Sequence, residues 1–120
     1  MYRIEKEFAF SAAHQLFGLR EGHQCARLHG HNYRVVVALQ ARELDATGFV
    51  RDYGDLDELK VYLDSNFDHR FLNNVANLPV QTSAENIAKA LYEWCVARWP
   101  EVCEVRVSET PKTWSSYVPG

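Results

Sequence analysis

Most of the histidines in this 120-residue sequence lie close together, between residues 13 and 31, and a cysteine lies among them. Imidazole nitrogens and thiolates are side-chain groups that bind zinc and carry protons near neutral pH. Such a group within one short segment indicates a metal site, a proton-transfer site, or both. The residues are His14, His23, Cys25, His29 and His31.

Three of these histidines have a spacing that suits a metal. His29 and His31 stand two apart at the start of an apolar β-type run, and extended geometry projects both rings to one face. His14 follows an earlier strand-like segment, and antiparallel pairing sets the end of one strand beside the start of the next. We therefore expect a three-imidazole site that holds Zn²⁺ and keeps a coordination position for water or substrate. His23 is expected to be an ordinary loop residue.

The cysteines have different expected roles. The spacing leaves three roles open for Cys25. It could be the fourth ligand of a closed structural zinc site, a small buried apolar residue, or a thiolate close to the metal. Cys95 and Cys103 occupy apolar positions of a predicted helix and strand, so we expect both in the core. An odd number of cysteines without secretory features fits a reducing compartment, and no disulfide framework is expected.

Two further places carry acid–base groups. Asp68 and His69 directly follow a predicted helix, where a carboxylate and an imidazole could relay a proton or could simply be solvated. Glu109 continues the side of a strand that carries Val105 and Val107. A carboxylate there either accepts two N–H groups of a heterocycle or ends the strand at the surface.

Hydrophobic periodicity predicts the elements that position these groups. Strands are expected over residues 2–11, 33–41, 103–108 and 114–118, with a long polar loop over residues 15–30. An apolar stripe predicts a helix that begins at Asp55, and the spacing of Thr82 and Glu85 matches a capping box at the start of a second helix. The second helix ends before Pro100. The order of elements is ββααββ.

This order predicts an α+β fold in one domain, residues 1–120, with an antiparallel four-stranded sheet and two helices on one face. Two sheet edges stay without partners, so we expect a symmetric homo-oligomer whose sheets join between subunits into a barrel. The net charge of −3 argues against a nucleic-acid partner. No run approaches the roughly 18 apolar residues of a membrane span, and the first residues lack a signal peptide, so a cytoplasmic protein is expected.

Six ordered segments of the chain resemble the 6-pyruvoyl-tetrahydropterin synthase and 6-carboxytetrahydropterin synthase family, which has the tunnelling fold. The C-x3-H-G-H spacing from Cys25 to His31 is similar to the bacterial 6-carboxy-5,6,7,8-tetrahydropterin synthases of queuosine (7-deazaguanine) biosynthesis. A further branch, which acts in folate synthesis, has glutamate in place of the cysteine, so the presence of Cys25 argues against that branch. The segments are residues 10–14, 25–33, 48–53, 68–73, 82–86 and 108–110.

The resemblance implies a lyase that converts 7,8-dihydroneopterin triphosphate to 6-carboxy-5,6,7,8-tetrahydropterin, acetaldehyde and triphosphate. It also implies a trimer or a dimer of trimers. Carried over by position, the resemblance implies that His14, His29 and His31 bind the zinc and that Cys25 transfers a proton. It implies a second proton-transfer unit at Asp68 and His69. Glu109 would bind the pterin ring, and Ser83 would contact the substrate. Ala84 stands where the family has a further hydroxyl residue, so Ser83 is the candidate there.

Two other functions compete with this one. The sister reaction gives 6-pyruvoyl-tetrahydropterin without carbon–carbon cleavage, and a non-catalytic module would use Cys25 and the histidines to close a structural zinc site. The triphosphate of either substrate must meet cations. Arg20, Arg27 and Lys112 are the nearest loop candidates.

Overall fold

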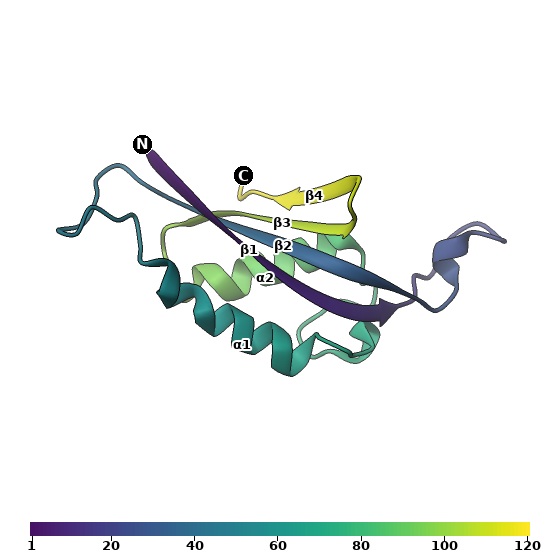
Figure 1. The fold of residues 1–120 in the computed structure, drawn as a ribbon. Helices are drawn as coiled ribbons and strands as arrows, with labels where there is room; N and C mark the ends of the chain where they lie inside the picture. Colours follow the sequence, from purple (N-terminus) through teal and green to yellow (C-terminus); the bar gives the residue numbers. More distant parts are fainter.

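Two long paired strands run along the molecule (Figure 1). In the computed structural model, which describes residues 1–120, β1 (Tyr2–His14) pairs antiparallel with β2 (His29–Ala41) along its whole length. The strands carry β-branched and aromatic residues at alternate positions, which suits a pleated surface with one buried face. Since β2 begins at His29 rather than at residue 33, the histidine pair lies within the sheet.

The remaining strands complete an antiparallel meander. β3 (Val102–Thr110) pairs with β2, and β4 (Thr113–Tyr117) pairs with β3, so the order across the sheet is β1-β2-β3-β4. The register shifts between Ala38 and Leu39, where the pairing of β2 with β3 is irregular. The shift is typical of a β-bulge, in which an extra residue is left out of the regular alternation.

The irregularity corrects one prediction about the cysteines. Cys103 lies outside the hydrophobic core, half-buried, with its sulfur 3.5 Å from the carbonyl oxygen of Ala38 and 3.5 Å from Nη1 of Arg3. Val102 occupies a core position instead. The expectation for Cys103 is wrong because the register shift breaks the strict alternation that it assumed. Cys95 lies in the core as predicted.

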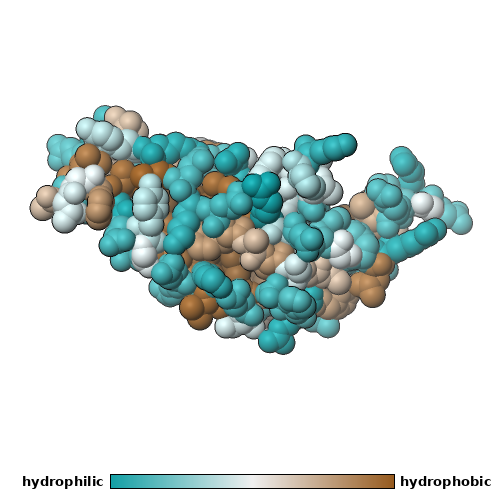
Figure 2. Space-filling model, in the orientation of Figure 1, coloured by the Kyte–Doolittle hydropathy of each residue, from teal (hydrophilic) through white to brown (hydrophobic).

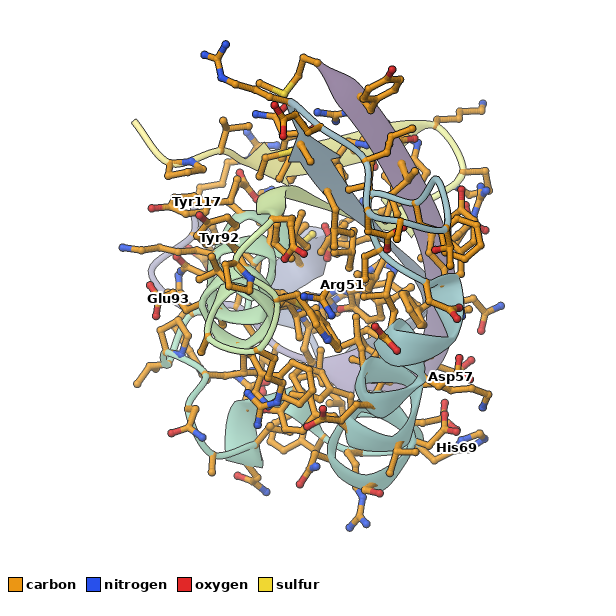
Figure 3. All side chains as sticks on the ribbon, turned by 90° about the vertical axis from the view of Figure 1, so that its left-hand side faces the viewer. Arg51, Asp57, His69, Tyr92, Glu93 and Tyr117 are labelled. Carbon is orange, nitrogen blue, oxygen red and sulfur yellow. The ribbon has the colours of Figure 1, made fainter.

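Two helices cover one face of the sheet (Figure 1). They are α1 (Asp57–Asn66), which follows a 3₁₀ turn at Tyr53–Leu56, and α2 (Ala84–Val96). Their buried leucines and isoleucine, with the inward residues of the strands, form one core between sheet and helices. Tyr92 of α2 packs against Tyr117 of β4 with ring centroids 5.1 Å apart, at the far end of the sheet from β1 (Figure 3). The predicted ββααββ order is confirmed.

The start of α2 differs from the predicted capping box by one residue. Ser83, not Thr82, is the N-cap, and its hydroxyl oxygen accepts a hydrogen bond from the N–H of Asn86 at 3.2 Å. Thr82 is fully buried and turns toward the sheet, where it contacts His14. The capping position moves because the threonine is taken up by this tertiary contact.

The other face of the sheet carries ion pairs between strands. Arg3 of β1 pairs with Glu104 of β3, and Arg34 of β2 pairs with Glu7 of β1 at 2.8 Å. The guanidinium group of Arg34 lies over the ring of Trp114 on β4, with its central carbon 5.3 Å from the ring centroid. No element of the chain covers this polar face.

Part of the edge of β1 is covered by the chain that leaves α1. The N–H of His69 donates to the carbonyl of Ser11 at 2.6 Å, and the N–H of Ala13 donates to the carbonyl of Arg70 at 3.1 Å. Asp68 accepts from the N–H of Ser11 at 2.8 Å. These bonds fix residues 68–70 beside the end of β1 that carries the first histidine of the site.

Two connections extend beyond the ends of the sheet (Figure 1). They are residues 15–28, between β1 and β2, and residues 42–52, between β2 and the turn before α1. Hydrophobic surface gathers at the left end of Figure 2, over the second connection, where Leu44 and Phe49 are exposed. Neither helix is long and apolar enough to cross a membrane.

Candidate metal centre and active site

The three histidines with metal-ligand spacing lie together on the helix-covered face of the sheet. The β1–β2 register sets His14 opposite His29, and His31 follows two residues along β2. One nitrogen from each ring lies within 4.8 Å of the others. His14 is fully buried, and the other two rings are half-buried. The strand geometry therefore brings together the three imidazoles that the sequence predicted as a group.

Backbone carbonyl groups determine which nitrogens face the centre of this group. Nδ1 of His14 lies 2.8 Å from the carbonyl oxygen of Thr82, and Nδ1 of His29 lies 2.6 Å from that of Arg27. A carbonyl oxygen only accepts hydrogen bonds, so both Nδ1 atoms carry the proton and each neutral ring keeps a lone pair on Nε2. Metal-binding histidines characteristically donate their second nitrogen to a carbonyl or carboxylate in this way.

The donor atoms then converge on a place that suits a cation. The Nε2 atoms of His14 and His29 are 3.0 Å apart, and lone pairs repel each other at that distance unless a positive centre lies beside them. Nε2 of His31 is buried with no hydrogen-bond partner. Burial lowers the pKa of His31, which favours the neutral, metal-binding form. Three imidazole nitrogens that converge in this way are a donor set that fits zinc.

Glu109, at the end of β3, adds a carboxylate to the same place. Its Oε2 lies 3.2 Å from Nε2 of His14 and 3.4 Å from Nε2 of His31. The close contact with the His14 ring is the largest cause that lowers the pKa of Glu109, against the opposing effect of burial. The carboxylate is ionised at neutral pH and adds negative charge to the three nitrogens. Glu109 is therefore an inward-facing residue and not a surface residue at the end of a strand.

Cys25 lies near this group along the chain but outside its donor atoms. It sits half-buried on a 3₁₀ turn, Gln24–Ala26, in the connection between β1 and β2. The cluster of ligand atoms contains the three imidazoles and not the sulfur of Cys25. His23 caps the turn, since its Nδ1 accepts from the N–H of Cys25 at 3.0 Å. The structure thus gathers three imidazoles that could hold a metal ion, without the sulfur of Cys25, and His23 serves as a hydrogen-bonding residue of the connection.

Asp68 and His69 meet each other beside the edge of β1. Oδ2 of Asp68 accepts from Nδ1 of His69 at 2.8 Å. The hydrogen bond from the N–H of Ser11 is the largest cause that lowers the pKa of Asp68, so this carboxylate is ionised at neutral pH. His69 adopts a left-handed backbone conformation, with φ of 58°, and its side chain points away from the molecule (Figure 3).

An open cleft joins this pair to the histidine group. A cleft of about 640 Å³ is lined by Asp68, His31, Tyr33 and Glu109, among others. A neighbouring cleft is lined by His69 and His31. A ligand in these clefts would therefore touch the imidazole group on one side and the carboxylate–imidazole pair on the other.

The remaining candidates are not among the residues that line these two clefts. Ser83 is half-buried and caps α2 directly after Thr82. Arg20 and Arg27 are exposed on the connection between β1 and β2, and Lys112 is exposed in the turn between β3 and β4. Residue patterns did not reveal the part played by the carbonyls of Thr82 and Arg27, because every residue type has a carbonyl.

Comparison with known proteins identifies the family. The profile of the family described as 6-pyruvoyl tetrahydropterin synthase matches residues 3–119. The chain belongs to this family. It is accordingly an enzyme of a pterin synthase family, as the ordered motifs indicated.

Relatives and solved structures agree with this membership. The chain is 38% identical over 106 residues to the 6-carboxy-5,6,7,8-tetrahydropterin synthase of Synechocystis, covering 84% of this chain and 77% of that protein. It is 30% identical over 129 residues to the enzyme of the same name from Bacillus subtilis, covering 98% and 86%. The Caenorhabditis elegans 6-pyruvoyl tetrahydropterin synthase superposes with a TM-score of 0.86 at 27% identity, covering 99% and 96%. The four-stranded tunnelling fold is thereby confirmed.

Proposed function

We propose that this protein is a zinc-dependent lyase that converts 7,8-dihydroneopterin triphosphate, with water, to 6-carboxy-5,6,7,8-tetrahydropterin, acetaldehyde and triphosphate in queuosine biosynthesis. One observation supports the metal in this proposal. Nε2 of His14 and Nε2 of His29 lie 3.0 Å apart, while the Nδ1 atom of each ring donates its proton to a backbone carbonyl. The names of the Synechocystis and Bacillus relatives support the reaction, as does the C-x3-H-G-H spacing that ends at His31.

In this proposal the protein's own residues bind the substrate and move its protons. His14, His29 and His31 would hold zinc, which would polarise the side-chain hydroxyl and carbonyl oxygens of the substrate and so make the neighbouring C–H groups more acidic. Cys25, outside the donor atoms, is free to take a proton as a thiolate. Asp68 and His69 form the second proton-transfer unit across the cleft. Glu109 accepts the N–H groups of the pterin ring, and Ser83 contacts the substrate.

The triphosphate group of the substrate needs cationic side chains that form no ion pair within the chain. Arg20, Arg27 and Lys112 are exposed, and none of their side chains takes part in an ion pair or hydrogen bond within the chain, in contrast to Arg34 or Arg51. They lie on two connections, the one between β1 and β2 and the one between β3 and β4. We propose that they bind the phosphate groups, as planar guanidinium groups and ammonium groups do elsewhere.

We further propose that the active form is a homo-oligomer, a trimer or a dimer of trimers, in which sheets join edge to edge. β1 is unpaired from Tyr2 to Phe10 on its outer edge, and β4 has no outer partner. Exposed strand edges of this length are normally covered in a folded protein. Joining them would also enclose the polar face of the sheet within a barrel.

Product analysis tests the reaction. Zinc-loaded protein is incubated with dihydroneopterin triphosphate, acetaldehyde is trapped and measured, and the pterin product is identified by mass. We expect acetaldehyde and the 6-carboxy product in equal amounts. Protein stripped of metal by a chelator serves as the control and should be inactive. No turnover by zinc-loaded protein would refute the proposal.

A predominant 6-pyruvoyl product would instead establish the sister reaction, which the structural likeness to the C. elegans protein keeps as the second candidate. Both reactions need the same proton-transfer groups up to the loss of triphosphate. The reactions differ in whether the carbon–carbon bond of the side chain is then cleaved. The same mass measurement therefore decides between them.

A further inference from the structure

Two side-chain amides hold the chain directly after the first histidine of the site. Oδ1 of Asn73 accepts from the N–H of Gln15 at 2.9 Å, and its Nδ2 donates to the carbonyl of Gln15 at 2.9 Å. Oε1 of Gln81 accepts from the N–H of Phe17 at 2.8 Å, and its Nε2 donates to the carbonyl of Phe17 at 2.7 Å. Each amide satisfies both backbone groups of one residue, as a neighbouring strand would. We call these two side chains, Asn73 and Gln81, the amide clamps.

The clamped segment in turn holds the turn that carries Cys25. The N–H of Leu16 donates to the carbonyl of Cys25 at 3.0 Å. Nε2 of Gln15 donates to the carbonyl of Ala26 at 2.8 Å. Residues 15–17 thus lie between the clamps on one side and the cysteine turn on the other. The position of Cys25 relative to His14 therefore depends on the clamped segment.

The clamps are themselves tied to the framework of the fold. Asn73 belongs to a 3₁₀ turn, Leu72–Asn74, whose first residue is fully buried in the core. Asn73 also donates to the carbonyl of Val80 at 3.2 Å, and Asn86 of α2 donates to the carbonyl of Gln81 at 2.9 Å. The far part of the connection, residues 18–22, is exposed. The clamps therefore anchor the end of the connection that follows His14 to the rest of the fold.

We propose that Asn73 and Gln81 are positioning residues that hold Cys25 at its working distance from the three imidazoles. This inference rests on the proposed role of Cys25 in proton transfer. A displacement of about 1 Å at a reacting group can cost about 10²-fold in rate. Removal of either amide frees the N–H and carbonyl of a clamped residue and lets the cysteine turn move. The metal site is built on β1 and β2 and keeps its own contacts.

The first test measures backbone protection without substrate. In zinc-loaded Asn73→Ala and Gln81→Ala, hydrogen exchange of peptides that cover residues 15–28 should accelerate about tenfold. Peptides from the centre of β2 should keep wild-type exchange. Asn74→Ala and Gln24→Ala are matched controls, since both side chains are exposed and form no hydrogen bond in the chain. Exchange in the clamp variants equal to that in the controls would overturn the proposal.

The second test follows Cys25 itself. Peptide mass spectrometry after iodoacetamide treatment should show Cys25 alkylated at least about threefold faster in each clamp variant, while buried Cys95 stays protected. Zinc stoichiometry should not change. Asn73→Asp keeps the size of the side chain but loses the Nδ2 donor, so it should behave like Asn73→Ala. If one clamp variant does not fold, the other carries the test, because each amide holds a different residue.

The third measurement separates positioning from a general loss of structure. With dihydroneopterin triphosphate, kcat should fall between about tenfold and 10²-fold in the clamp variants while KM stays within about twofold. A change confined to KM would overturn the assignment. Lack of turnover by the wild-type protein would refute the proposed reaction alone, because the exchange and alkylation results need no substrate.

Discussion

At the candidate metal centre, the chemistry of each histidine depends on what its second nitrogen contacts. Thr82 and Arg27 use their carbonyl oxygens to keep the protons of His14 and His29 on Nδ1, which leaves Nε2 of each ring for a metal. Glu109 brings an ionised carboxylate to the same place. A cation bound among these atoms removes the mutual repulsion of lone pairs and negative charge, so binding and site geometry support each other.

Loss of one imidazole should abolish tight metal binding. Loss of a hydrogen-bond partner of a ligand typically lowers metal affinity about 10–100-fold, so His29→Ala, which removes a ligand itself, should lower zinc affinity by more than about 100-fold. His23→Ala is the control, because His23 caps the cysteine turn and is not part of the imidazole group. Competition with a chelator of known affinity measures both. Equal affinities in the two variants would contradict the assignment.

Removal of the Cys25 sulfur should separate catalysis from metal binding. Cys25→Ala should lower kcat by about 10² to 10⁴-fold, the usual contribution of a general acid or base. Zinc content should stay at the wild-type level, because the sulfur is not among the convergent donor atoms. Cys103→Ala, at a half-buried thiol on β3, should keep both properties. Loss of zinc from Cys25→Ala would instead support a closed structural site.

At the scale of elements, the site depends on how strand ends and helix starts meet. The long β1–β2 pairing brings the histidines together, and the chain after α1 covers the end of β1 and sets Asp68 and His69 beside it. The start of α2 serves two purposes, since Thr82 orients His14 and Ser83 caps the helix. A change at the start of α2 should therefore affect metal binding through Thr82 and the stability of the fold through Ser83.

Removal of the helix cap should destabilise the fold. Ser83→Ala leaves the N–H of Asn86 without its side-chain acceptor, and loss of such a cap costs about 1 kcal/mol. Urea unfolding at equal zinc content measures the free energy of unfolding. Ser65→Ala, at an exposed position of α1, should change it by less than about 0.5 kcal/mol. If both variants were equally stable, the capping role of Ser83 would be wrong.

At the scale of the whole molecule, the single chain leaves two strand edges and one polar face of the sheet open. The polar face carries cross-strand ion pairs, including Arg34 with Glu7, and Trp114 lies against it. The helix-covered face holds the core and the candidate site. This division suits an assembly in which the helices lie outside and the polar faces of several sheets line a common interior.

A proline on the free edge of β1 should disrupt this assembly. Ser11 and Ala13 donate their N–H groups outward to Asp68 and Arg70, and N–H groups alternate along a strand, so the N–H of Ala9 also faces the free edge. Ala9→Pro removes that donor, which edge strands tolerate within one chain. Light scattering should give the wild type a multiple of the 13.8 kDa chain mass.

The Ala9→Pro variant should shift toward the single-chain mass while circular dichroism remains that of the wild type. Ala9→Val, which retains the N–H, should keep the assembly. A monomeric wild type, or an Ala9→Pro protein that assembles like the wild type, would contradict edge-to-edge joining at β1.

The sequence by itself determined the order of elements and the group of three histidines. It could do so because the two-residue alternation of a strand, the helical stripe and the antiparallel return of a hairpin are local rules. They place His29 and His31 on one face, set His14 beside them, and put Cys95 in the core. The ordered motifs likewise indicated the family that the profile match confirms.

Only the tertiary structure decided the features that depend on backbone atoms and long-range packing. The carbonyls that orient His14 and His29, the contact of Glu109 with the imidazoles, and the irregular register that moves Cys103 out of the core are of this kind. The two amide clamps on residues 15 and 17 belong with them. Every residue type carries the same N–H and carbonyl, apart from proline, so no residue pattern shows which backbone groups will meet a distant side chain until the chain has folded.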